Sequence, residues 1–185
     1  MKIVVLNGSP QKNGITKQIT DYLLKNINAE ITTHYAYEVN VKACIACHYC
    51  FKHPNECVIK DDFQQIMTDF AQADVVVLAS PLHFSSFTGQ LLSVISRMQY
   101  LFALKYEHKQ EIPFKNKKGV TIITGGNDYK SMFDAIKPVD SIIYNHINAK
   151  KRQRLLIKAT DQYSVPELIE QYQAEIIDII SFIKE

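Results

Sequence analysis

Residues 7–16 form a loop of small polar residues whose position and composition suit the binding of a phosphate group. The loop follows the apolar run Lys2–Leu6 and leads into a helical pattern that begins near Ile15. Backbone N–H groups at a helix N-terminus have no intrahelical partner, and the macrodipole adds partial positive charge there. No Gly-Lys-Ser/Thr sequence follows, and Gly8 and Gly14 stand alone, so neither a nucleoside triphosphate loop nor a dinucleotide fingerprint is present. We expect a phosphate monoester here; a turn with a helix cap and no ligand is the alternative.

The cysteines are the second group of residues that could carry chemistry. All four lie in one short segment, at Cys44, Cys47, Cys50 and Cys57. The first three have the C-x₂-C-x₂-C spacing of bacterial ferredoxins, which lets three thiolates cap one region of a [4Fe–4S] cube while a fourth closes it. Here the fourth follows after six residues rather than three, and Val58 replaces the usual proline.

Three other interpretations of the cysteines stay open. They could be free thiols that line a site, ligands of a structural zinc ion, or a disulfide pair. Zinc sites prefer two separate cysteine pairs, whereas this chain has a single run. Structural disulfides are rare in the cytosol, where we expect this chain because the core strand at its N-terminus does not fit a secretory signal.

The elements that must position these residues alternate between strand and helix. Amphipathic helical patterns follow the apolar strands, and Asp61 and Asp62 resemble an N-cap pair for the helix that uses Phe63 to Phe70. A long helix is predicted from Leu91 to Phe102, and Pro138 must kink or open the next one. The predicted strands are 2–6, 31–39, 74–79, 120–123 and 154–158. This pattern predicts an α/β domain with a buried parallel sheet and helices on both faces.

Three polar loops follow the predicted strands, at residues 7–14, 80–88 and 124–130. In open α/β sheets, ligands bind beyond the carboxyl ends of the strands. We therefore expect these three loops to meet on one rim and to form a binding site.

The same three loops carry a family resemblance. The segments Asn7–Thr16, Ser80–Leu91 and Thr124–Gly126 resemble, in order, the three flavin loops of the flavodoxin-like NAD(P)H-dependent FMN reductases. The resemblance implies one flavodoxin-like FMN-binding domain over residues 1–185, a three-layer sandwich with a five-stranded parallel sheet of order 2-1-3-4-5. The residues that it implies as FMN contacts are Ser9, Gln11, Lys12, Asn13, Gly14, Ile15 and Thr16 for the phosphate, and Pro81, Leu82, His83, Phe84, Ser85, Thr124, Gly125 and Gly126 beside the isoalloxazine ring.

Particular positions support or depart from this pattern. Gly125 and Gly126 would let backbone approach a flat ring without a side-chain clash. Gln11 and Ile15 stand where the family commonly has arginine and asparagine, and Ser96-Arg97 stands where an Asp-Arg pair is usual. His83 could touch the flavin edge or face solvent.

The segment from Cys57 to Asp62 resembles the corresponding part of the iron–sulfur flavoproteins, a subgroup of the same fold. This resemblance makes Cys44, Cys47, Cys50 and Cys57 the expected ligands of a [4Fe–4S] cluster. It also implies a homodimer or homotetramer in which two subunits bring cluster and flavin together.

The resemblance implies an FMN-dependent NAD(P)H oxidoreductase of the flavin or quinone reductase type, or an electron-transfer flavoprotein. NAD(P)H is the expected donor, the acceptor is unknown, and no side chain is assigned as catalytic because the flavin carries the chemistry. The alternatives are a flavodoxin-like electron carrier and a cofactor-free thiol or metal-binding module. The net charge of +2 favours no particular partner. We interpret the basic runs at Lys115, Lys117 and Lys118 and at Lys150 to Arg154 as solvated strand entrances rather than a nucleic-acid patch. No apolar run is long enough to span a membrane.

Overall fold

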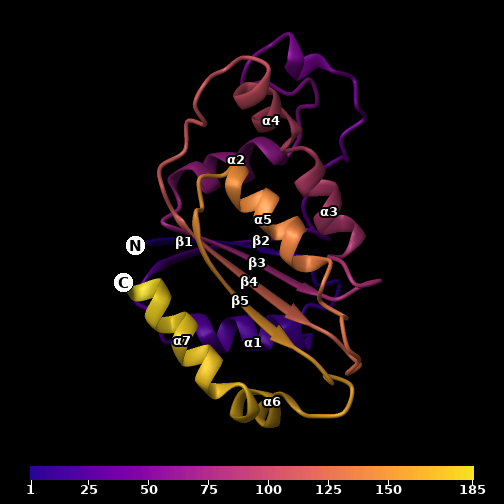
Figure 1. The fold of residues 1–185 in the computed structure, drawn as a ribbon, viewed down its shortest axis with the longest axis vertical. Coiled ribbons are helices and arrows are strands. Elements are labelled where there is room, and N and C mark those ends of the chain that lie inside the picture. Colours follow the sequence, from indigo (N-terminus) through magenta and orange to yellow (C-terminus); the bar gives the residue numbers. More distant parts are fainter.

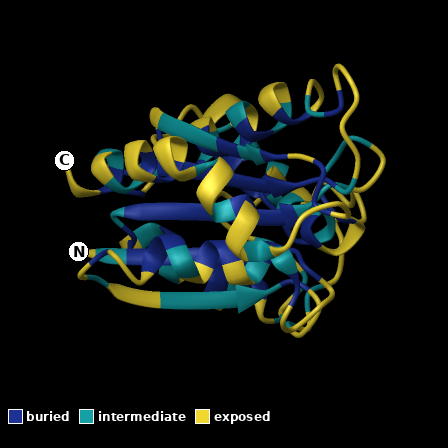
Figure 2. Ribbon diagram, turned by 90° about the horizontal axis from the view of Figure 1, so that it is seen from below, coloured by how far each residue is buried: buried dark blue, intermediate teal, exposed yellow.

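The computed structural model describes residues 1–185 and contains one sheet of five parallel strands. The strand order is β2-β1-β3-β4-β5, which confirms the predicted order. The strands are β1 (Lys2–Asn7), β2 (Glu30–Tyr35), β3 (Val75–Pro81), β4 (Lys118–Thr124) and β5 (Lys151–Ile157). β1, β3 and β4 are almost wholly buried, whereas β2 lies at an edge and stays partly exposed (Figure 2).

Helices cover both faces of the sheet. Figure 1 shows α1, α6 and α7 on one face, and α2, α3 and α5 on the other, with α4 above them. The helices are α1 (Ile15–Leu24), α2 (Phe63–Gln72), α3 (Gly89–Ser96), α4 (Gln99–Tyr106), α5 (Ile136–His146), α6 (Val165–Gln171) and α7 (Gln173–Lys184), with a short 3₁₀ turn η1 (Tyr49–Phe51). Each face has its own apolar core, since the β-strand side chains alternate between the two. No helix is both long and apolar enough to cross a bilayer.

Several predicted boundaries were wrong. The second strand ends at Tyr35, not at residue 39. The predicted helix 91–102 is two helices, because the N–H groups of Arg97 and Met98 bond to the carbonyls three residues back and tighten the chain into a turn. Pro138 lies in the first turn of α5, where its missing N–H costs no hydrogen bond, so it opens the helix rather than kinking it.

Lys117 was also interpreted wrongly, since it is buried rather than a solvated strand entrance. Its ammonium donates to the carbonyls of Phe70 and Ala71, where α2 ends. A cation is favoured there by the helix dipole. Burial nevertheless lowers the pKa of Lys117 to about 8.

Candidate functional site

The first loop leaves the start of α1 open to an anion. Gly14 is the N-cap of α1 and offers no side-chain cap, and the first turn of the helix contains no acidic residue. The loop is braced internally: the Ser9 N–H donates to Asn7 Oδ1 at 2.8 Å, and the Gln11 N–H donates to Ser9 Oγ at 3.2 Å. The amide groups of the first helical turn therefore remain available to a phosphate.

Gly8 lets this loop approach the start of α3 closely. Its N–H donates to the Ala79 carbonyl at 2.7 Å, and its carbonyl accepts from Thr88 Oγ1 at 2.8 Å. A Cβ atom at this position would lie 2.8 Å from Thr88 Oγ1 and 2.9 Å from Leu91 Cβ. A larger residue would push the first loop away from the second.

The structure brings the three predicted flavin loops together. The buried hydroxyls of Thr16 and Thr124 are 2.7 Å apart, which joins the first loop to the third. The Leu82 N–H donates to the Thr124 carbonyl at 2.8 Å, and Ser85 Oγ lies 3.0 Å from the Tyr129 hydroxyl, which joins the second loop to the third. The predicted convergence on one rim is confirmed in this geometry.

A tight turn at the tip of the second loop presents an aromatic side chain. His83 and Ser86 exchange two backbone hydrogen bonds of 2.9 Å each. Between them, Phe84 and Ser85 both have positive φ, 48° and 58°, which is uncommon for residues other than glycine. His83 and Phe84 are exposed, and the Phe84 ring is completely so. Strain of this kind often marks a functional turn.

A fourth loop, residues 158–163, completes the rim, and sequence reasoning missed it. The N–H groups of Thr160 and Asp161 donate to the carbonyls of Gly125 and Gly126 at 3.0 and 3.3 Å. A Cβ atom at Gly126 would lie 2.3 Å from Asp161 Oδ2. One at Gly125 would lie 2.4 Å from Met132 Cε. A side chain at either glycine would therefore have to displace the end of the Met132 or Asp161 side chain, so packing within the chain adds a second reason for glycine beside the predicted access for a flat ring.

The cysteines surround a separate cavity of about 310 Å³. Cys44, Cys47, Cys50 and Cys57 all line it, as does Ser96 at the end of α3. No three His, Cys, Asp or Glu side chains lie close enough together to hold a single metal ion. The four thiols therefore surround a space instead of meeting at one point.

Backbone geometry shapes the cysteine segment, residues 44–57. Ala46 and His48 both have positive φ, 51° and 57°, so the chain reverses on either side of Cys47. The Ala46 N–H donates to Cys44 Sγ at 3.5 Å, and the Cys44 N–H donates to Ser96 Oγ at 3.0 Å. Burial and then the other three cysteines raise the pKa of the Cys50 thiol, because its thiolate would be poorly solvated and close to other negative charges.

Arg97 joins the residues that flank the cysteine segment on either side. Its Nη1 donates to the Lys42 carbonyl at 2.9 Å and to Asp61 Oδ2 at 2.8 Å, and its Nη2 donates to the Ile59 carbonyl at 2.9 Å. The Arg97 side chain is fully buried and that of Asp61 is 3% exposed. Burial favours the neutral form of Asp61, but the guanidinium and the N–H groups of Lys42 and Phe63 hold its pKa below the ordinary value.

The predicted N-cap of α2 belongs to the same arrangement. Asp61 Oδ1 accepts from the Phe63 N–H at 3.2 Å, and Gln64 Oε1 accepts from the Asp61 N–H at 3.0 Å. These two bonds lie one residue before the N-cap of α2, which is Asp62 and makes no side-chain cap bond, so they brace the entry to the helix without forming a capping box. Sequence reasoning identified Asp61 as part of an N-cap pair and missed its bond to Arg97. No pattern in the sequence around Asp61 predicts that bond.

The comparison with protein families now bears on this geometry. Residues 1–149 match the model of the NADPH-dependent FMN reductase family. The chain belongs to this family.

Two relatives of this FMN reductase family member are iron–sulfur flavoproteins. It is 27% identical to an iron–sulfur flavoprotein of Methanocaldococcus jannaschii over 129 residues, 69% of this chain and 63% of that one. It is 31% identical to an iron–sulfur flavoprotein of Archaeoglobus fulgidus over 126 residues, 66% of this chain and 54% of that one. The chain therefore spans less than two thirds of the length of these relatives.

The solved structures show the fold. The NAD(P)H:quinone oxidoreductase from Methanothermobacter marburgensis superposes with a TM-score of 0.72 at 10% identity, over 100% of this chain and 98% of that one. The fold is flavodoxin-like, as the resemblance implied.

Within this family member, α3 links the two candidate sites. The helix begins at Gly89, directly after the second loop of the rim, and ends at Ser96, which lines the cysteine cavity. Eight residues of helix rise about 12 Å. The rim of loops and the cysteine cavity thus lie about one short helix apart.

Proposed function

We propose that this chain is an FMN-dependent NAD(P)H oxidoreductase that passes electrons to an iron–sulfur cluster held by its four cysteines. The observation that carries the proposal is the convergence of Cys44, Cys47, Cys50 and Cys57 on one cavity, a helix length from a rim shaped for a flavin. Membership of the FMN reductase family supports the flavin, and the iron–sulfur flavoprotein relatives support the cluster.

The residues of the rim fit a flavin mononucleotide. The uncapped first turn of α1 offers backbone N–H groups to the phosphate, with Ser9, Asn13 and Thr16 beside it. The turn at residues 83–86 and the segment Thr124–Gly126 would flank the ring. Bound FMN supplies hydride acceptance and the release of electrons singly or in pairs. The chain's own part is to bind and orient it, so we assign no side chain as acid or base.

The cysteine cavity fits a cluster better than a single ion. Four thiols that surround a space suit an object with several metal atoms, and a [4Fe–4S] cluster supplies a one-electron carrier. The buried Arg97 guanidinium lines the same cavity and offsets the negative charge of thiolates there. NAD(P)H as the donor, and assembly into a homodimer or homotetramer, remain part of this proposal.

Anaerobic purification with cofactor analysis tests it. We expect about one FMN with about four irons and four sulfides per chain, and no stoichiometric zinc. Anaerobic mixing with NADPH or NADH should bleach the flavin absorbance. The variant Cys57→Ser should lose iron and keep FMN, whereas Ser93→Ala, a partly exposed position on α3 that does not line the cysteine cavity, should keep both.

Each part of the proposal can fail separately. A flavin that stays oxidised with both nucleotides would favour an electron carrier over a reductase. Bound FMN without iron would leave the reductase and remove the cluster. A colourless protein that takes up no added FMN would overturn the proposal in favour of a thiol or metal-binding module.

A further inference from the structure

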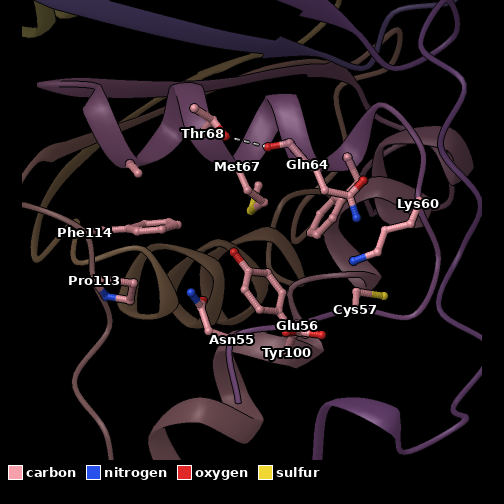
Figure 3. A pocket seen from close by; sticks show the side chains of 12 residues that line it. Asn55, Glu56, Cys57, Lys60, Gln64, Met67, Thr68, Tyr100, Pro113 and Phe114 are labelled. Carbon is pink, nitrogen blue, oxygen red and sulfur yellow. Dashed lines mark hydrogen bonds between the residues drawn. The ribbon is translucent and has the colours of Figure 1, made fainter. Parts of the chain in front are cut away.

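A second cavity, of about 320 Å³, lies beside the cysteine cavity and has no residue in common with the rim. Cys57 and Tyr100 line both cavities and so form the wall between them. Figure 3 shows this second cavity, with Met67, Gln64 and Thr68 of α2 on one side and Pro113 and Phe114 on another. Its volume lies at the lower end of the range of roughly 300–1,000 Å³ that is usual for small-molecule sites.

The floor of this cavity is aromatic and well ordered by packing. Phe63, Met67, Tyr100 and Phe114 are between 2% and 8% exposed. The rings of Phe63 and Tyr100 meet edge to face at 5.8 Å, and the Arg97 guanidinium lies 4.7 Å from the centre of the Phe63 ring. Rings held in this way provide flat walls before any ligand arrives, which favours a planar aromatic occupant.

One polar group on the floor is free to bond to a ligand. Tyr100 is a residue that is only 7% exposed, its hydroxyl makes no hydrogen bond within the protein, and the hydroxyl points into the cavity (Figure 3). Burial raises the pKa of Tyr100, so the hydroxyl stays protonated and can donate. The oxygen itself is open to the cavity, so a ligand oxygen would take the place of water there.

The other polar groups show what kind of ligand is missing. Gln64 and Thr68 are already engaged, through hydrogen bonds to Ile59 and to the helix backbone. Lys60, on the rim, forms no ion pair, and Glu56 accepts a hydrogen bond from Tyr49 outside the cavity. The Tyr100 hydroxyl and the Lys60 ammonium thus remain free to donate to an acceptor on a ligand, and the Asn55 amide, which also lines the cavity, can either donate or accept.

We propose that this cavity is a binding site for a small planar aromatic molecule that carries a carbonyl oxygen. The ring packs among Phe63, Met67 and Phe114, and the oxygen accepts from the Tyr100 hydroxyl. The ligand then lies against Cys57, next to the cysteine cavity and away from the flavin rim. None of the groups that form this site belongs to the rim, and only Cys57 is shared with the proposed cluster ligands. Binding is therefore tested at Met67 and Tyr100, which hold no cofactor in the proposed function.

Methyl NMR of the purified protein with ¹³C-labelled methionine tests the site. Met67 lines the cavity, whereas Met132 lies beside Gly125 on the rim, so the two methyl groups report on different places. Acetophenone is the probe, and ethylbenzene is its analogue without the oxygen. We expect acetophenone to shift the Met67 signal in a saturable way and to leave the Met132 signal unchanged.

The variant Tyr100→Phe removes the donor and keeps the ring. We expect it to weaken acetophenone binding about three- to tenfold, the loss of one neutral hydrogen bond, and to leave the binding of ethylbenzene unchanged. Tyr106→Phe is the matched control, because Tyr106 is on the same helix but is 45% exposed and does not line the cavity.

Three results would overturn the proposal. The first is a Met67 signal without a saturable shift. The second is a Met132 signal that shifts with the same midpoint, which would place the probe at the rim. The third is a Tyr100→Phe variant that binds acetophenone as tightly as the unchanged protein. The methionine spectrum of each variant without probe shows whether it is folded, so a loss of binding is distinguished from a loss of structure.

Discussion

The buried pair of Arg97 and Asp61 makes a strong prediction about stability. In the variant Asp61→Asn the amide keeps the size of the carboxylate and can still accept from the Phe63 N–H, but its charge is gone. The Arg97 guanidinium would remain fully buried without its counterion. The two groups are 2.8 Å apart, and Arg97 also bonds to the carbonyls of Lys42 and Ile59, which flank the cysteine segment. The loss in free energy of unfolding should therefore be large.

The size of the expected loss of stability follows from the burial of both charged side chains. Removing one partner of a buried ion pair typically costs about 3–5 kcal/mol, because the other charge is left uncompensated. A domain of this size loses about 2–4 °C in melting temperature for each kcal/mol, so Asp61→Asn should melt roughly 6–20 °C lower. The exposed pair of Lys158 and Asp128 is the control, and Asp128→Asn there should cost less than about 1 kcal/mol.

Urea unfolding at neutral pH measures these costs, with the cofactor content of all variants matched because bound groups add stability. Hydrogen exchange adds a local readout, and protection in residues 42–61 should fall further than protection in the sheet. The double variant of Asp61→Asn with Arg97→Met should recover part of the loss, since no unpaired buried charge remains.

The direction in which the contribution of Asp61 to stability changes with pH can also be checked. Because the pKa of Asp61 is lowered in the folded protein, its contribution is complete above the pKa of the unfolded chain, about 3.9, and is lost as the pH falls through the folded value. Asp61→Asn should lack this part of the acid destabilisation. A cost of Asp61→Asn below about 1 kcal/mol, or no recovery in the double variant, would refute the reasoning.

Two further predictions concern the core. The pKa of Lys117 falls from 10.5 to about 8, so between these values the unfolded chain binds a proton that the folded chain lacks, and stability should rise with pH in this window. Urea unfolding across this pH range should show a more positive slope of stability against pH for the protein than for Lys117→Met, and equal slopes would contradict the assignment. A Cβ atom at Gly119 would lie 2.6 Å from the buried Tyr144 ring, so Gly119→Ala should lose about 1–3 kcal/mol by overpacking. Gly89→Ala, with no atom within 4 Å of the added carbon, should be nearly neutral in the same melting experiment, and similar losses at both glycines would be the contrary result.

The two candidate sites lie at opposite ends of α3. The rim of loops at the carboxyl ends of the strands offers backbone groups and small side chains, while the cysteine cavity lies beyond the end of α3 and is closed from behind by Arg97. The cavity that we propose as an aromatic site lies on the other side of Cys57 from the cysteine cavity. These sites are close because α2, α3 and α4 pack on the same face of the sheet.

Much of the fold could be predicted from the sequence because it depends on local pattern. Apolar strands such as 74–79 predict burial on both faces, and alternation with helices predicts a parallel sheet. The carboxyl ends of parallel strands share one edge, so the meeting of the first three loops also followed. The gathering of the four cysteines around one cavity could also be predicted, because residues that are close in the sequence are also close in space.

Only the tertiary structure decided the rest, because the deciding contacts join residues far apart in the chain. Asp61 and Arg97 are 36 positions apart, and neither neighbourhood indicates the other. The break between α3 and α4 accompanies the burial of Arg97, which a helical pattern running through it could not show. The free hydroxyl of Tyr100 exists because α2 and α4 meet without supplying an acceptor. Periodicity along the chain reports which face of an element is buried, whereas pairing across the core depends on which elements come to face each other.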